Sequence, residues 1–267
     1  MDTHQINTIS ILGCGWFGLA FAQALVAQGY AVKGSTTSVE KLDVLAANDI
    51  KPYLVNFTAG KVIADPSFFE ADALFVCIPP KRSSTELNDY PLKISAILKA
   101  AENKSKNIVL ISSTSVYGDE NKTVDEHSDT NPDTPSGKVV LAAEALFKAQ
   151  YPSRFTIIRF AGLIGPNRNP GRFFAGKTDV PNGLAPVNLV QQVDAVGFAC
   201  KLLEKQAFGK IYNVCAPEHP TRTDFYTAAA RKADLTPPSF IAEKVQWKVI
   251  NSVNVPQLGY DFQEKLK

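Results

Sequence analysis

The sequence is poor in the residues that build metal centres and disulfide frameworks. Its three histidines and four cysteines show no spacing typical of metal ligands, so we expect no metal and only free, buried thiols. Strong charge of one sign is also missing: the net charge is +2 and no block of like charges occurs, which argues against a nucleic-acid partner. No apolar run is long enough to span a bilayer. These absences predict a cytoplasmic protein with no membrane contact.

The clearest motif lies in residues 6–29. A short apolar run at residues 9–12 predicts a buried parallel strand, and an apolar pattern at helical spacing follows it. Between them stand Gly13, Gly15 and Gly18, in the spacing G-x-G-x-x-G. The first glycine permits the tight turn, the second admits a pyrophosphate, and the third lets the helix pack on the strand. This strand–turn–helix context predicts a Rossmann-type, doubly wound α/β fold that binds a dinucleotide.

Two further residues of the motif, Trp16 and Phe17, open the predicted helix. Their backbone N–H groups and the positive end of the helix dipole would face the phosphates. We therefore count both among the cofactor-binding residues. The alternative, a glycine-rich turn that binds nothing, requires all three glycines to serve the backbone alone.

The loop after the second predicted strand bears on the choice of cofactor. NAD-selective folds tend to place an acid here, which holds the ribose 2′-hydroxyl, but the first acid in this segment is Glu40, already in the next helix. Ser35, Thr36, Thr37 and Ser38 offer hydroxyls for a 2′-phosphate, with Lys33 or Lys41 nearby. We expect NADP to be favoured over NAD, while a solvated turn is the alternative.

An uninterrupted apolar segment, residues 73–78, predicts a central strand that ends at two prolines. Open α/β sheets bind ligands at the carboxyl ends of their strands, so Ile78, Pro79 and Pro80 are expected beside the cofactor. Lys81 and Arg82 follow; they could meet a phosphate or an acidic substrate, or could simply be solvated.

Several later motifs share one family pattern. They are S-S-T-S-V-Y-G at residues 112–118, L-A-A-E at 141–144, R-F-A-G-L-I-G-P at 159–166, N-L-V-Q-Q-V-D at 188–194 and I-Y-N-V at 211–214. Together with the glycine motif, they resemble the extended short-chain dehydrogenase/reductase superfamily of the NAD(P)-dependent epimerase/dehydratase type. The resemblance covers nearly the whole chain. It implies an NAD(P) cofactor and a small-molecule substrate, either a carbonyl compound or a sugar nucleotide.

The chain departs from this family at the catalytic helix. In the family, a Tyr-x-x-x-Lys pair precedes the L-x-x-E pattern, and the tyrosine transfers the proton at the reacting oxygen. Aligning L-A-A-E puts the tyrosine position at Ser136 and the lysine position at Val140. Both catalytic residues are therefore missing, and an unassisted serine is a poor acid. This combination resembles the atypical members of the superfamily.

The resemblance assigns what remains of the site to residues 112–117. Ser113 stands at the position of the family's catalytic serine or threonine, which hydrogen-bonds the substrate carbonyl, and Ser112 is expected to contact the cofactor. Tyr117 could line the pocket, and a shifted arrangement using Tyr117 or Lys138 is a further possibility. For Tyr117 we favour a structural role, as a buried aromatic whose hydroxyl binds a backbone partner.

A long segment rich in glycine, proline and asparagine spans residues 165–183. In the resembled family it covers the nicotinamide and the substrate. Arg168 and Arg172 could bind an anionic substrate, with Phe173 as part of a lid, and a solvated basic loop is an equally good alternative. Thr114, which flanks Ser113, is a further candidate for substrate contact.

The chain reads as one extended unit without a linker or repeat. Residues 1–163 and about 187–215 are expected to form the dinucleotide-binding core, and about 164–186 and 216–267 a small substrate lobe. The resemblance also suggests a homodimer that forms through the predicted helices at 86–102 and 139–150.

Two functions are weighed against each other. The first is an NAD(P)-linked oxidoreductase or epimerase/dehydratase-like enzyme, supported by the glycine motif and Ser113. The second is a non-catalytic NADP-binding sensor or scaffold, which explains the missing tyrosine and lysine directly. A relic that binds no dinucleotide is disfavoured because all three glycines are intact.

Overall fold

A seven-stranded parallel sheet forms the centre of the computed structural model, which describes residues 6–58, 61–80, 87–152 and 155–266. The strand order is β12-β9-β7-β6-β1-β2-β3. These strands are β1 (Thr8–Leu12), β2 (Ala31–Thr36), β3 (Lys51–Leu54), β6 (Ala71–Val76), β7 (Ser105–Ser113), β9 (Phe155–Phe160) and β12 (Ile211–Val214). The chain winds outward from β1 in both directions, so the order reverses between β1 and β6. The predicted doubly wound α/β fold is confirmed, and this reversal creates a crevice at the carboxyl ends of the strands.

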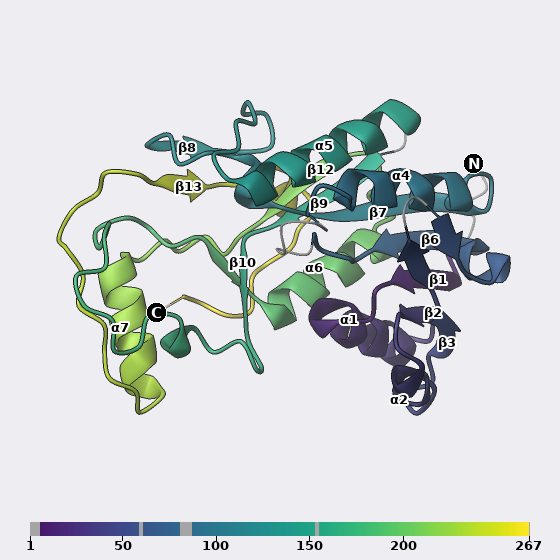
Figure 1. Ribbon diagram of the computed structural model, residues 1–267, viewed down its shortest axis with the longest axis horizontal. Helices are drawn as coiled ribbons and strands as arrows, with labels where there is room; N and C mark the ends of the chain where they lie inside the picture. The colour runs from purple at the N-terminus through teal and green to yellow at the C-terminus, as the bar shows by residue number, and fades with distance from the viewer. Residues whose placement is uncertain (1–5, 59–60, 81–86, 153–154, 267) are drawn as a thin grey trace.

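Helices cover both faces of the sheet (Figure 1). On one face α1 packs beside α6, and on the other α4 packs beside α5. The helices are α1 (Trp16–Ala27), α2 (Leu42–Ala46), α4 (Tyr90–Ala101), α5 (Pro135–Gln150), α6 (Gln192–Glu204), α7 (Arg222–Lys232) and α8 (Asn254–Gln257). Pro91, which sits awkwardly inside a helix beginning near residue 86, falls in the first turn of α4, where a missing N–H costs nothing.

The strands owe their central position to runs of residues that are apolar on both faces. Ile9, Ile11, Phe75 and Val109 are all fully buried, as expected for parallel strands covered by helices on both sides. The strand β2 continues to Thr36 and so includes part of the segment that the sequence predicts as the loop after the second strand. This extension brings two of the residues predicted to bind the cofactor into the sheet itself.

Shorter elements decorate the sheet. They are β4 (Asn56–Thr58), β5 (Lys61–Ile63), β8 (Lys122–Val124), β10 (Gly162–Ile164), β11 (Leu189–Gln191), β13 (Lys248–Ile250) and the 3-10 turns η1 (Val39–Lys41), η2 (Pro66–Phe69), η3 (Thr114–Val116) and η4 (Pro170–Arg172). The strands β10 and β11 pair in parallel, as do β8 and β13, while β4 and β5 are antiparallel.

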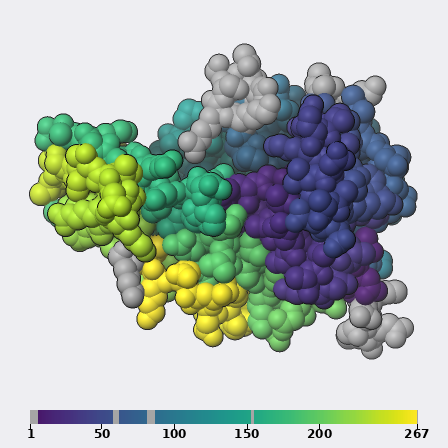
Figure 2. Space-filling model, turned by 90° about the horizontal axis from the view of Figure 1, so that it is seen from below, coloured from purple at the N-terminus to yellow at the C-terminus, as the bar shows by residue number. Residues whose placement is uncertain are grey.

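A small lobe projects from one end of the molecule (Figure 2). It contains α7, whose first turn is capped by the Thr221 side chain, and η4 packs against this helix. A second apolar cluster forms its interior. Within the range expected for the lobe, however, Ile250 and Val255 pack into the main core. The predicted division of the chain into core and lobe stays a prediction, and the C-terminal segment spans both clusters.

Two buried carboxylates hold this C-terminal segment. Glu126 accepts hydrogen bonds from the Ser252 hydroxyl and the Val253 N–H. Asp194, fully buried in α6, accepts from the Tyr260 hydroxyl at 3.0 Å and from the N–H groups of Gln263 and Glu264 at 2.7 and 3.2 Å. Buried carboxylates are stable only when paired or hydrogen-bonded in this way, so the tail is an integral part of the fold.

Three general expectations can be compared with the described residues. No helix among them is long and apolar enough to cross a membrane. All four cysteines carry free thiols. Leu92 on α4 and Leu146 on α5 expose 60% and 40% of their surface; the homodimer expected through these helices stays a prediction.

Candidate functional site

The turn between β1 and α1 has the geometry that each glycine predicts. Gly13 adopts a φ of +98°, which only glycine tolerates easily. A Cβ on Gly18 would lie 2.2 Å from the carbonyl oxygen of Gly13, so the helix approaches the turn more closely than any side chain allows. At Gly15, by contrast, a Cβ would meet nothing within 4 Å. The turn is therefore closed on its inner side and open where a phosphate would approach.

The open side of this turn presents unpaired donors. Helix α1 begins at Trp16 and has no acidic residue in its first turn. Its first N–H groups have no carbonyl partners within the helix, and they lie at the positive end of the helix dipole. An anion is the complementary ligand for such a terminus, and the glycines leave the backbone accessible to it.

Replacing Gly18 with alanine is expected to destabilise the fold, because the new Cβ would collide with a backbone oxygen that cannot rotate away. We expect the free energy of unfolding to fall by about 1–3 kcal/mol. Gly15→Ala is the matched control: its φ of −84° suits alanine and its Cβ would meet open space, so a change of about 0.5 kcal/mol or less is expected. Urea denaturation followed by circular dichroism measures both, and equal effects of the two variants would contradict the close packing.

Ser35 braces the glycine turn from below. Its hydroxyl accepts a hydrogen bond from the Gly13 N–H at 2.9 Å, and its carbonyl accepts one from Cys14 at the same distance. The residue is only 2% exposed. This geometry favours a supporting role for Ser35 over direct contact with a 2′-phosphate. Burial of the neighbouring Cys14 thiol raises its pKa to about 12, despite an opposing hydrogen bond from the Ser35 backbone, so this cysteine stays protonated.

We call residues 35–38, which are expected beside the ribose, the ribose loop. Apart from Ser35, this loop is more exposed. Thr36 is half-buried and Thr37 exposed, so both can reach solvent. Lys33 is committed elsewhere: its ammonium donates to the carbonyl oxygens of Ser67 and Glu70 at 2.7 and 2.6 Å. Glu40, although it lies in η1, folds back and accepts a hydrogen bond from the Ser38 hydroxyl. An acid thus lies closer to this loop than the sequence order implied.

The end of β6 lies against the glycine turn. A Cβ on Gly13 would approach Ile78 Cγ2 to 2.8 Å, which places Ile78 beside the first glycine; its contact with the cofactor stays a prediction. Pro79 is exposed and Pro80 half-buried. The carbonyl of Ile78 accepts a hydrogen bond from Tyr90 on α4, which fixes the start of this loop. Lys81 and Arg82, for which both a ligand contact and simple solvation were considered, lie outside the described residues.

Ser113 ends β7 and caps η3. Its hydroxyl accepts a hydrogen bond from the Ser115 N–H at 3.1 Å, and the residue remains partly exposed. Because this bond uses an acceptor lone pair, the hydroxyl hydrogen can still donate to a ligand. Thr114 is buried, so its side chain is less accessible than a substrate contact requires. Ser136 is half-buried in the first turn of α5, and Val140, one turn later, is buried.

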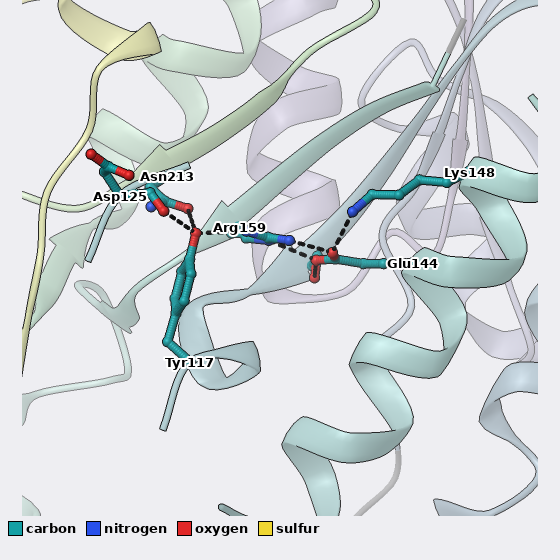
Figure 3. A network of polar contacts seen from close by, with 7 residues as sticks. Tyr117, Asp125, Glu144, Lys148, Arg159 and Asn213 are labelled. Carbon is teal, nitrogen blue, oxygen red and sulfur yellow. Dashed lines mark hydrogen bonds and ion pairs between the residues drawn. The ribbon is translucent and has the colours of Figure 1, made fainter. Parts of the chain in front are cut away.

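Glu144 and Arg159 form the centre of a buried ion-pair network (Figure 3). The Ser112 hydroxyl donates to Glu144 Oε1 at 2.6 Å. Arg159 binds both oxygens of the same carboxylate, at 2.9 and 2.6 Å, and is 1% exposed. Lys148 lies 3.7 Å from the carboxylate at the edge of the network. The two-pronged contact of the Arg159 guanidinium with the Glu144 carboxylate, together with Ser112, links β7, α5 and β9.

The same network occupies the hydroxyl of Tyr117. This oxygen accepts from Arg159 at 2.6 Å and lies 2.7 Å from the carbonyl of Asp125 and 3.1 Å from the side-chain oxygen of Asn213, its two alternative acceptors. Burial raises the pKa of Tyr117, and the opposing charge of Arg159 compensates only in part. A buried phenol with these partners serves structure, which agrees with the role favoured from the sequence.

The residues predicted to bind substrate separate into two places. Arg168 stacks on Trp16, with its guanidinium carbon 4.2 Å from the ring centroid, and so belongs beside the glycine turn. Arg172 and Phe173 lie in the lobe, where Phe173 packs 6.2 Å from Tyr226 and stays 41% exposed. Arg168 thus contacts the residue that opens α1, whereas Arg172 lies in η4, which packs against α7; the shared role of the two arginines in binding an anionic substrate stays a prediction.

The sequence did not lead us to the Arg159–Glu144 ion pair. It also did not reveal that the Tyr90 hydroxyl binds the Ile78 carbonyl at the start of the loop after β6. A signal for the pair exists in the sequence: Arg159 is the lone charge in the apolar strand F-T-I-I-R-F, and such a charge needs a buried partner. No comparable signal marks Tyr90, whose partner is a backbone carbonyl.

Comparisons with known proteins agree with this geometry. The model of the NAD dependent epimerase/dehydratase family matches residues 9–215. Protein YeeZ of Escherichia coli strain K12 is 36% identical over 265 residues, which are 97% of this chain and 96% of that protein.

Solved structures show the same fold at lower identity. A UDP-glucuronic acid 4-epimerase from Bacillus cereus in complex with NAD superimposes with a TM-score of 0.79 at 18% identity, covering 97% of this chain and 94% of that chain. A functionally unknown conserved protein from Silicibacter pomeroyi gives a TM-score of 0.76 at 21% identity, with the same coverage. From the matched residues and the full-length relative, the chain is a member of the NAD dependent epimerase/dehydratase family.

Proposed function

We propose that this protein binds a nicotinamide dinucleotide at the β1–α1 turn and acts on a small carbonyl compound or a sugar nucleotide. The observation that carries the proposal is the asymmetry of the glycine turn. A Cβ on Gly18 would lie 2.2 Å from the Gly13 carbonyl oxygen, so the turn is closed on its inner side. A Cβ on Gly15 would meet nothing within 4 Å, so the turn is open on its outer side. Gly13, Gly15, Trp16 and Phe17 would hold the pyrophosphate, with Ile78 at its side.

The bound dinucleotide would supply or accept a hydride, and the chain would orient the substrate. Ser113 is the residue best placed to do so, since its oxygen is fixed by the Ser115 N–H while its hydrogen is free to donate. Ser136 offers a second hydroxyl. It is half-buried at the start of α5, which packs against the η3 turn that follows Ser113. The substrate class rests on family membership and on the sugar-nucleotide epimerases that share the fold.

A non-catalytic sensor or scaffold is the second candidate, and the Tyr117 geometry favours it. The hydroxyl of Tyr117 is saturated by Arg159 and the carbonyl of Asp125, so it cannot replace the missing proton donor. Val140 is 4% exposed and offers no charge to a ribose. A protein of this kind would bind the cofactor without turnover.

The geometry of the ribose loop supports NAD at least as well as NADP. The sequence favoured NADP because hydroxyls and Lys33 surround this loop. Since Lys33 is held by two backbone carbonyls and the Glu40 carboxylate turns toward Ser38, a 2′-phosphate would find fewer cations than expected. We therefore propose that the affinity for NADP does not exceed that for NAD.

Gly15→Asp is expected to abolish dinucleotide binding without unfolding the protein. The carboxylate would occupy the open approach to the turn and repel the pyrophosphate, raising Kd by at least about 100-fold. Aspartate is also a favourable N-cap residue, so α1 should be retained. Calorimetric titration with NAD, NADH, NADP and NADPH measures binding, and thermal unfolding is the control for the fold.

The outcomes separate the candidates. Micromolar binding that is lost in Gly15→Asp supports the cofactor site. Single-turnover oxidation of the bound reduced cofactor by a carbonyl compound, or reduction of the bound oxidised cofactor by a sugar nucleotide, would then identify an enzyme. Binding without any turnover in such a screen supports the sensor. Failure of all four dinucleotides to bind the wild-type protein would refute the proposed function.

A further inference from the structure

The side chain of Arg168 lies against Trp16, the residue that opens α1. The guanidinium carbon is 4.2 Å from the centroid of the Trp16 ring, which is a cation–π stack. Arg168 belongs to the segment that begins at residue 165, directly after β10. This segment lies more than 140 residues after Trp16 in the sequence. The contact therefore joins the glycine turn to the start of the long loop.

The contact is built by more than one interaction. The turn from Gly165 to Arg168 is closed by reciprocal backbone hydrogen bonds of 3.3 and 2.9 Å. The Trp16 indole donates to the carbonyl of Pro166 at 2.6 Å, and the Gln192 side chain donates to the Trp16 carbonyl at 2.7 Å. A Cβ on Gly165 would lie 3.4 Å from the Trp16 ring. These bonds fix both the ring and the turn that carries the guanidinium.

The charge of Arg168 is not balanced within the described parts of the chain. Its guanidinium makes no ion pair or hydrogen bond with any described residue, and the side chain is exposed. The first turn of α1 holds no acid either. Two sources of positive potential, the guanidinium and the helix N-terminus, thus stand next to each other at Trp16 without a counter-charge.

We propose that Arg168 binds the pyrophosphate of the dinucleotide, completing the glycine turn with a charged side chain from the long loop. This inference rests on the proposed function, since it names a further residue of the same site. Arginine suits the role because its planar fork donates to two phosphate oxygens at once while its face stays stacked on an aromatic ring. Trp16 would orient the fork, and the Gly165–Arg168 turn would bring it into place.

The test measures binding of NAD, NADP, ADP-ribose and adenosine to the wild-type protein, Arg168→Ala and Arg168→Lys by calorimetry. Loss of a charge-assisted bond to phosphate should raise Kd by about 10- to 100-fold for the three pyrophosphate ligands in Arg168→Ala. Adenosine, which lacks phosphate, should be unaffected. Arg168→Lys keeps the charge without the fork and should lie between the two. Arg231→Ala, an exposed arginine on α7, is the matched control and should bind as the wild type does.

Each other outcome overturns the proposal. If the wild type binds dinucleotide and Arg168→Ala binds all ligands within twofold of it, Arg168 makes no phosphate contact, while the proposed function stands. Weakening confined to NADP would place Arg168 on the 2′-phosphate instead. Equal weakening for adenosine would indicate a structural effect through Trp16. A wild type that binds none of the ligands refutes both this inference and the proposed function.

Discussion

Replacing Glu144 with glutamine is expected to lower the free energy of unfolding by about 3–5 kcal/mol. Glutamine has the shape of glutamate, but it leaves the guanidinium of Arg159, which is 1% exposed, without a compensating charge. It also offers one acceptor oxygen where Arg159 and Ser112 now use two. Guanidinium chloride denaturation at neutral pH measures the change.

An exposed ion pair provides the control for Glu144. Glu204 on α6 lies 3.2 Å from both Lys201 and Lys205, yet it remains 57% exposed. Glu204→Gln should change the unfolding free energy far less than Glu144→Gln does, because solvent screens the charges of an exposed pair.

A double variant keeps the prediction testable if Glu144→Gln does not fold. Glu144→Leu combined with Arg159→Met removes both charges, and it should be more stable than Glu144→Gln alone, because the main cost of the single change is the unpaired charge. A Glu144→Gln protein as stable as Glu204→Gln would show that the pair is not decisive.

Replacing Asp194 with alanine is expected to lower the free energy of unfolding by about 3 kcal/mol and to loosen the C-terminal segment selectively. The carboxylate is fully buried and accepts from the Tyr260 hydroxyl and from two backbone N–H groups. Without it, those donors have no partner in the interior. Hydrogen exchange followed by mass spectrometry should show faster exchange in residues 260–266, with the central sheet still protected.

Tyr260→Phe distinguishes the hydroxyl donor of Asp194 from its two backbone N–H donors. It removes one hydrogen bond to Asp194 but keeps the ring, which packs edge-on 5.7 Å from Phe198. A loss of about 1 kcal/mol is expected, with little change in exchange at residues 263 and 264. If Asp194→Ala leaves exchange of the tail unchanged, the carboxylate does not hold the segment.

The fold and the glycine turn could be predicted because their signals are local. The spacing of Gly13, Gly15 and Gly18 between an apolar strand and a helical pattern specifies one backbone path. The ribose loop was harder for a physical reason. The strand continues through Gly34, where a Cβ would lie 2.6 Å from Ile50 Cγ2, and this carries Ser35 into the interior. That close approach depends on a neighbouring element, so no local pattern reveals it.

Long-range side-chain contacts account for what else was missed. Lys33 and Arg168 both look available in the sequence, yet the first is held by carbonyls of residues 67 and 70 and the second by Trp16. Long, flexible side chains choose partners only after the tertiary structure has formed. Tyr117 was easier, since a tyrosine close after a buried strand has few alternatives to burial with its hydroxyl paired.

The buried carboxylates Glu126 and Asp194 also impose an order on biosynthesis. Strands β1, β2, β3 and β6 are complete by residue 76 and can pair as soon as they leave the ribosome. Asp194, however, finds its donors only at residues 260–264, and Glu126 finds one at Asn213 but the others only at residues 252 and 253. During translation, neither carboxylate has all of its donors until the C-terminal segment has been made. The interior around α6 and β12 can therefore be completed only late in synthesis, after the glycine turn between β1 and α1 has formed.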